Sequence, residues 1–230
     1  MDISPHITPI IAIALYLAYP KHLRINPLFL YKLSVAHNAG LVIFSGWTFG
    51  SLASILYNDG IVFQHNYYFT NPKFDTIIYW FYISKYYEFA DTFLLYLNDK
   101  TPLFLQKYHH IGAVLSWYLM YSHRVDMVWM ATLLNSGVHT VMYSYYLGCL
   151  LKIKQVRLIK KYITTLQLCQ FFILYSNFYL YRPPIETWFN YGIISFFAAY
   201  GVGIIGLFCR FYYDSYIVKE KIGRIQYIYI

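Results

Sequence analysis

Residues 102–120, PLFLQKYHHIGAVLSWYLM, form an apolar run that carries Gln106, His109 and His110 near its start. About 20 apolar residues are needed for a helix to cross the hydrocarbon core of a bilayer. A charged side chain at that depth costs about 2.5 to 3.5 kcal/mol on insertion scales, so ionisable groups there are rare and usually functional. The run therefore indicates a membrane helix that carries a functional site.

The composition of the whole chain favours a membrane protein. Of its 230 residues, 59% are hydrophobic and only 12% are charged, whereas soluble domains carry about 25% charged residues. The 28 tyrosines suit membrane interfaces and helix packing. The three cysteines form no close-spaced motif, which argues against a disulfide framework or a zinc site.

Apolar segments recur along the chain with short polar breaks between them. We predict an all-α polytopic membrane protein, a bundle of seven transmembrane helices. No linker or repeat divides the chain, so residues 1–230 are expected to form one domain. The predicted helices are Ile7–Tyr19, Val35–Tyr57, Thr76–Leu97, Pro102–Met120, Val125–Leu151, Ile163–Tyr181 and Trp188–Tyr212.

Basic residues are distributed unevenly over the loops between these helices. Alternate loops place fourteen Lys and Arg residues on one side of the membrane and three on the other, with Lys85 inside a helix. Basic loops stay in the cytosol, which predicts a lumenal N-terminus and a cytosolic C-terminus. The basic loop from Lys152 to Lys161 would then suit a polyanionic head group at the cytosolic side.

Two groups of polar residues interrupt the third and fourth predicted helices. Spacings of three and seven place Lys85, Glu88 and Thr92 on one face, with Asp91 at its edge. The alternative interpretation is a structural ion pair of Lys85 with Glu88. The second group is Gln106, His109 and His110, again on one face. Two adjacent imidazoles are less simply explained as packed core residues.

Two further polar faces lie on the fifth and sixth predicted helices. They are Asn135, His139, Met142 and Tyr146, flanked by Tyr143 and Tyr145, and Lys160, Thr164, Gln167 and Phe171, with Gln170 beside them. Hydrogen bonding between helices is the alternative interpretation of both. Polar faces on four helices are satisfied only by facing one another, so we expect a hydrated or hydrogen-bonded chamber that opens to the cytosol.

Three classes of function fit imidazoles in such a chamber. A di-iron oxygenase or desaturase needs more histidine ligands than the three that fall in the polar faces. A small transporter or lipid-binding membrane protein explains the apolar composition but not paired imidazoles beside a basic rim. Acyl transfer needs a nucleophile or base, an orienting neighbour and oxyanion donors. His109, His110 and His139 supply the first two, and the donors would come from Asn135, Gln167 and Gln106.

Four motifs stand in a fixed order along the chain. They are Lys85-x-x-Glu88-x-x-Asp91-Thr92, Gln106-x-x-His109-His110, Asn135-x-x-x-His139-x-x-Met142-Tyr143-x-Tyr145-Tyr146 and Thr164-x-x-Gln167-x-x-Gln170-Phe171. Together they resemble the ELO family of fatty acid elongases, the 3-ketoacyl-CoA synthases of the endoplasmic reticulum. Tyr16-Leu-Ala-Tyr-Pro20 with Asn26-Pro27 also resembles the family's first loop. Gln106 stands where the family more often has the first histidine of His-x-x-His-His.

The resemblance implies a seven-helix bundle in the endoplasmic reticulum membrane that encloses an acyl-CoA chamber. The implied reaction condenses a long-chain acyl-CoA with malonyl-CoA to a 3-oxoacyl-CoA two carbons longer, and releases CO2 and CoA. Besides the two substrates and membrane lipid, the reductases and the dehydratase of the elongation cycle are implied partners, and a homo-oligomer is left open. We expect no metal, no further cofactor and no nucleic-acid partner.

We hypothesise that His109 accepts the acyl group as an acyl-imidazole, and that a malonyl-derived enolate then attacks the acyl carbon. His110 would orient the histidine box, and His139 would act as a base or as a second positioning imidazole. Direct condensation with a histidine as base alone is the alternative. The catalytic set would be His109, His110, His139, Gln106 and Asn135. The expected substrate-binding residues are Lys85, Glu88, Asp91, Thr92, Tyr143, Tyr146, Lys160, Thr164 and Gln167.

Overall fold

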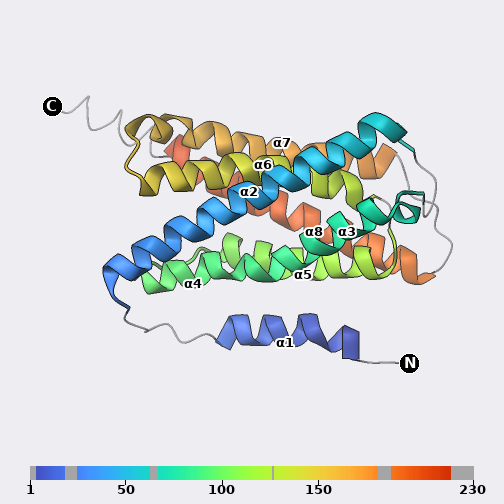
Figure 1. Cartoon of the computed structure of the whole chain (residues 1–230), viewed down its shortest axis with the longest axis horizontal. Helices are drawn as coiled ribbons and strands as arrows, with labels where there is room; N and C mark the ends of the chain where they lie inside the picture. Colours follow the sequence, from blue (N-terminus) through green and yellow to red (C-terminus); the bar gives the residue numbers. More distant parts are fainter. Residues whose placement is uncertain (1–3, 19–24, 63–66, 126, 181–187, 219–230) are drawn as a thin grey trace.

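The computed structural model describes residues 4–18, 25–62, 67–125, 127–180 and 188–218, and all regular structure in these ranges is helical (Figure 1). The longer helices are α1 (Ser4–Ala18), α2 (Pro27–Asp59), α3 (Pro72–Tyr87), α4 (Phe89–Leu97), α5 (Phe104–Ser122), α6 (Val128–Leu150), α7 (Lys160–Leu180) and α8 (Trp188–Tyr212). The short ones are the 3-10 turns η1 (Tyr68–Thr70) and η2 (Lys154–Ile159) and the π-helical turn η3 (Tyr213–Val218). The all-helical fold class is thus confirmed.

Helix α2 begins earlier than the sequence predicted, at Pro27 instead of Val35. The Asn26 side chain accepts hydrogen bonds from the backbone amides of Leu28 and Phe29, at 2.9 and 3.3 Å. Asn is a favoured N-cap residue, and proline fits the first helical turn, where its missing N–H is not needed. The Asn26-Pro27 pair therefore sets the start of α2.

The predicted helix Thr76–Leu97 is interrupted in the structure. Helix α3 ends at Tyr87 and α4 begins at Phe89, with Glu88 between them. The Glu88 backbone amide still donates to Ser84 O at 2.9 Å, and the Asp91 amide donates to Glu88 O at 3.0 Å. The second bond spans three residues instead of four, so the rod tightens at the point where the polar residues Glu88 and Asp91 lie.

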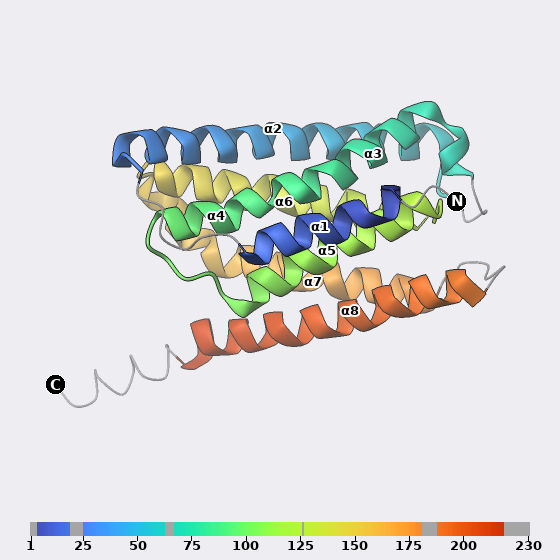
Figure 2. The same ribbon diagram turned by 90° about the horizontal axis from the view of Figure 1, so that it is seen from below.

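Successive helices run in alternate directions when α3 and α4 are counted as one continuous rod (Figures 1 and 2). The start of α2 and the α4–α5 and α6–α7 connections lie at one end, on the left in Figure 1, which we call the basic end. It holds Lys100 and the basic loop from Lys152 to Lys161, whereas Lys73 and Arg124 belong to the other end. Basic positions 21, 24, 182, 219, 221 and 224 lie outside the described residues. Which end faces the cytosol stays a prediction.

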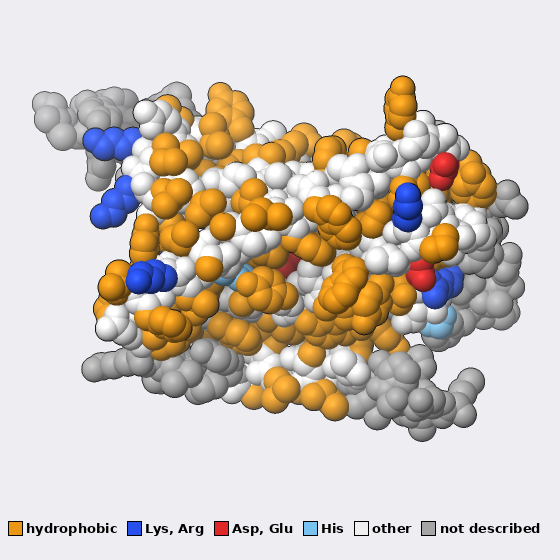
Figure 3. Space-filling view, viewed as in Figure 1, with side chains coloured by type: hydrophobic (Ala, Val, Ile, Leu, Met, Phe, Trp, Pro, Cys, Tyr) orange, Lys and Arg blue, Asp and Glu red, His pale blue; other side chains and the backbone are white. Residues whose placement is uncertain are grey.

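The outer surface is strongly apolar. Large hydrophobic side chains cover the middle of the face in Figure 3, and Lys and Arg gather toward its ends. Ile43 is 73% exposed and Leu15 is 67% exposed. Within the described ranges, the helices at 27–59 and 191–218 are long and apolar enough to cross a bilayer. These features indicate a membrane protein, and the seven-span arrangement stays a prediction.

The two halves of the bundle are filled differently. An aromatic core occupies the half away from the basic end, around Phe74 and Phe81 of α3, Trp117 of α5 and Trp129 of α6. In the other half, the predicted polar faces of α4, α5, α6 and α7 face one another. The packed aromatic half thus holds the helices in the register that brings these polar residues together.

Candidate active site

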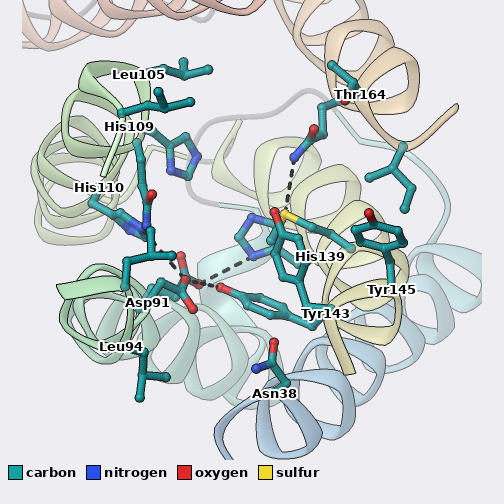
Figure 4. A pocket seen from close by; sticks show the side chains of 18 of the residues that line it. Asn38, Asp91, Leu94, Leu105, His109, His110, His139, Tyr143, Tyr145 and Thr164 are labelled. Carbon is teal, nitrogen blue, oxygen red and sulfur yellow. Dashed lines mark hydrogen bonds and ion pairs between the residues drawn. The ribbon is translucent and has the colours of Figure 1, made fainter. Parts of the chain in front are cut away.

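A cavity of about 480 Å³ lies in the half nearest the basic end (Figure 4). All four predicted polar faces contribute to its wall. They supply Glu88 between α3 and α4, Asp91 from α4, Gln106, His109 and His110 from α5, His139, Met142, Tyr143 and Tyr146 from α6, and Lys160, Thr164, Gln167 and Gln170 from α7. Ser34 and Asn38 of α2 also line it, and the sequence analysis did not predict them.

Three imidazoles lie close together on this wall. The ring centroids of His109 and His110 are 5.5 Å apart, and those of His109 and His139 are 6.3 Å apart. His110 and His139 are 5% and 4% exposed. The histidines that the sequence placed on two different helices therefore form one cluster, in which His109 is close to both of the others.

A ring of hydrogen bonds and ion pairs fixes His139. Lys85 Nζ donates to Glu88 Oε1 at 2.7 Å and to Asn135 Oδ1 at 3.0 Å. Asn135 Nδ2 is 3.2 Å from His139 Nε2, and His139 Nδ1 is 3.6 Å from Glu88 Oε1. Both nitrogens of the His139 ring thus face partners. Glu88 Oε2 and His139 Nδ1 are buried without a hydrogen-bond partner of their own, so the hydrogen bonds of Lys85 are what hold this group together.

The sequence interpretation also places Lys85 and the basic loop against the phosphates of CoA, but in the structure Lys85 lies away from the cavity. It is 1% exposed and is absent from the described cavity lining. Its Nζ lies 3.9 Å from the centroid of the Phe81 ring and 5.0 Å from that of Trp117, as in a cation–π contact. Contact with a CoA phosphate would require Lys85 to leave these partners. The structural ion pair with Glu88 is present, and direct substrate binding by Lys85 stays a prediction.

Asp91 is bonded from two other helices. Its Oδ1 lies 2.8 Å from Nε2 of His37 on α2, and its Oδ2 accepts the Tyr143 hydroxyl at 2.7 Å. Oδ2 is also 3.9 Å from His110 Nε2. The sequence analysis missed His37, because a single histidine in an apolar helix gives no signal of its partner 54 residues away.

Thr92 links Gln106 to the first helix. Its Oγ1 accepts a bond from Gln106 Nε2 at 3.2 Å and lies 2.8 Å from the Tyr16 hydroxyl. The Tyr16 ring stacks on Phe89, with 4.2 Å between centroids. Thr92 is 1% exposed and does not appear in the described cavity wall, so it acts on the site through Gln106.

Side chains of the α7 polar face line the cavity and also form hydrogen bonds to other helical segments. Gln167 Nε2 is 3.2 Å from Met142 Sδ of α6, and Thr164 Oγ1 is 3.1 Å from the Tyr216 hydroxyl. Gln167 therefore lies on the cavity wall, as the chamber interpretation predicts, and also bonds between helices, as the alternative interpretation predicts. Lys160 and Lys100 line the cavity at the basic end, where they could neutralise a phosphorylated ligand.

The geometry suits group transfer on a bulky, partly anionic substrate. A neutral imidazole can act as a nucleophile or a base, and the three imidazoles face one cavity whose remaining wall is largely apolar. Among the described residues, no group of three or more His, Cys, Asp or Glu side chains is placed to hold a metal ion. The fold and site define an all-helical membrane protein with a histidine-lined cavity beside a basic end.

Comparison with known proteins places this chain in a family. A family model described as ELO, the GNS1/SUR4 family, matches residues 3–223. The chain therefore belongs to the ELO family, and the resemblance seen in its motifs is confirmed.

Characterised relatives cover most of the chain. Fatty acid elongase sre1 of Dictyostelium discoideum is 30% identical over 84% of this chain and 77% of its own. Very long chain fatty acid elongase 5 of Xenopus laevis is 30% identical over 90% of this chain and 73% of its own. Long chain fatty acid elongase 2 of Caenorhabditis elegans is 28% identical over 80% and 72%. No solved structure matches the chain.

Proposed function

We propose that this protein is a fatty acid elongase of the endoplasmic reticulum membrane. It condenses a long-chain acyl-CoA with malonyl-CoA to a 3-oxoacyl-CoA two carbons longer, with release of CO2 and CoA. The observation that carries the proposal is the convergence of His109, His110 and His139 on one cavity in a member of a family whose relatives are named fatty acid elongases.

The first half-reaction is acyl transfer to His109. A ring nitrogen of His109 attacks the thioester carbonyl carbon, the C–S bond breaks, and the CoA thiolate leaves and takes up a proton. Covalent catalysis of this kind divides one difficult step into two easier ones. The rings of His110 and His139 lie 5.5 and 6.3 Å from that of His109 between centroids. They support this assignment because a nearby imidazole is a suitable proton acceptor.

The second half-reaction is condensation. Malonyl-CoA loses CO2, and the electron pair of the broken C–C bond forms a thioester enolate. The enolate carbon attacks the acyl carbonyl, and the bond from the acyl carbon to the His109 nitrogen breaks. That nitrogen takes up a proton from solvent, which restores the neutral imidazole. Gln106 and Gln167 line the cavity and are candidate donors to the developing oxyanions. Asn135 contacts His139 and, with His109, lines the second cavity described below.

Two smaller cavities extend the site away from the basic end. His109, Gln170 and Phe171 line both the main cavity and a cavity of about 40 Å³. Leu174 and Phe197 line that second cavity and a third of about 20 Å³. We therefore place CoA near the basic end and the acyl chain along this series of cavities beyond His109.

A single assay tests the proposed function. Purified protein is incubated with malonyl-CoA and a panel of acyl-CoAs, and 3-oxoacyl-CoA is measured by mass spectrometry. His109→Ala should abolish the product, whereas His123→Ala, at the far end of the same helix, should retain it. No product from the wild type, or equal product from His109→Ala, would contradict the proposal and favour a transporter or lipid-binding protein.

A further inference from the structure

His37 is a buried imidazole that the proposed mechanism does not use. Its side chain is 3% exposed, and it does not appear in the described lining of the main cavity. Its Nε2 nevertheless lies 2.8 Å from Oδ1 of Asp91, which does line the cavity. His37 is therefore separated from the site by a single carboxylate.

The Asp91 carboxylate is held by one contact at each oxygen. An ionised carboxylate only accepts hydrogen bonds, so His37 donates through Nε2–H to Oδ1 and Tyr143 donates through its hydroxyl to Oδ2. These donors come from two different helices, α2 and α6. Together they fix the rotation of the carboxylate, with Oδ2 at 3.9 Å from His110 Nε2.

The His37 ring is itself held in place from the helices packed around it. Tyr87 of α3 lies 5.1 Å away between ring centroids, and Tyr143 of α6 meets the His37 ring edge-on at 6.4 Å. Asp91 of α4 is the third titratable group in contact with the His37 ring. The imidazole thus presents one nitrogen to Asp91 in a fixed direction.

We propose that His37 is a positioning residue for the condensation. Its Nε2–H holds Asp91 so that Oδ2 faces His110, and the carboxylate keeps His110 oriented beside His109. The separation of 3.9 Å is longer than a hydrogen bond, so Asp91 acts on His110 through its charge. This inference rests on the proposed elongase function and adds a residue of α2 to it.

Three variants separate the hydrogen bond from the volume of the ring. His37→Gln places an amide N–H near the position of Nε2, His37→Asn is too short to do so, and His37→Phe keeps a ring without a donor. We expect His37→Phe and His37→Asn to lower kcat by about 10- to 100-fold, as loss of a positioning bond does. The KM for both substrates should change little, and His37→Gln should recover most of kcat.

A double variant tests whether His37 acts through Asp91. If it does, His37→Phe combined with Asp91→Asn should be no slower than Asp91→Asn alone, because the carboxylate charge that His37 positions is already lost. Independent structural damage would make the two effects multiply, and that result would overturn the inference. Thr48→Val, a near-isosteric change at a fully buried position of α2, should leave activity unchanged.

The outcomes distinguish this inference from the proposed function. If the wild type forms no 3-oxoacyl-CoA, the elongase function and the inference both fail. If the wild type is active and His37→Phe has the same kcat, the function stands and the inference is wrong. Thermal unfolding of each variant in detergent separates a loss of kcat from a loss of folded protein.

Discussion

The ring of Tyr200 on α8 lies against Gly112 of α5, so closely that a Cβ at position 112 would overlap it. The Tyr200 hydroxyl donates to the backbone carbonyl of His109 at 3.1 Å. The Tyr200 ring also stacks on that of Tyr108, with 5.5 Å between centroids. The helix that carries the histidine box is therefore fixed to α8 by a contact that only glycine permits at position 112.

Gly112→Ala should destabilise the protein. The added methyl group must displace the Tyr200 ring, and overpacking of this kind costs about 1 to 3 kcal/mol. The melting temperature in detergent should fall, and elongation should fall with it because His109 shifts. Gly206→Ala on α8 is the matched control, since a Cβ there meets nothing within 4 Å. Equal melting temperatures for the two variants would refute the contact.

The covalent route predicts an adduct on one residue. Incubation with acyl-CoA alone should yield a peptide carrying the acyl group on His109, identified by tandem mass spectrometry. His109→Ala should form no adduct, because the nucleophile is gone. If the wild type turns over both substrates but never forms the adduct, direct condensation with a histidine as base is the better mechanism.

Removing Lys85 should affect stability more than substrate binding. Lys85→Met leaves Glu88 as an unpaired buried carboxylate, which destabilises a protein by about 3 to 5 kcal/mol. The double variant Lys85→Met/Glu88→Gln should recover part of that loss, since no charge is then left unpaired. Unfolding in detergent measures both. A raised KM for acyl-CoA with unchanged stability would instead support direct phosphate binding by Lys85.

The cavities beyond His109 predict which residues limit acyl chain length. Phe197→Ala should enlarge the second and third cavities, because Phe197 lines both of them together with Leu174. The products from a panel of acyl-CoAs should then shift toward longer chains. Phe196→Ala is the control, because Phe196 is 38% exposed on the same helix. An unchanged product profile for Phe197→Ala would place the acyl chain elsewhere.

The sequence determines which residues share a face of each helix. Gln106, His109 and His110 share a face because the helical period fixes their directions, whatever surrounds the helix. The same period selected the α6 and α7 faces that line the cavity. The alternation of loops also placed Lys100 and the basic loop from Lys152 to Lys161 at one end of the bundle, since successive helices must reverse direction.

Contacts between helices depend on the rotation and register of each helix, which periodicity leaves free. His37 meets Asp91 across 54 residues, and Lys85 meets Asn135 across 50. The sequence around each residue does not reveal its partner, because the residue keeps the same place on its own helix in many different packings of the helices. Close approach at Gly112 and aromatic packing around Phe81 select one of those packings. The sequence thus specified the polar faces, and side-chain packing settled which residues of those faces meet.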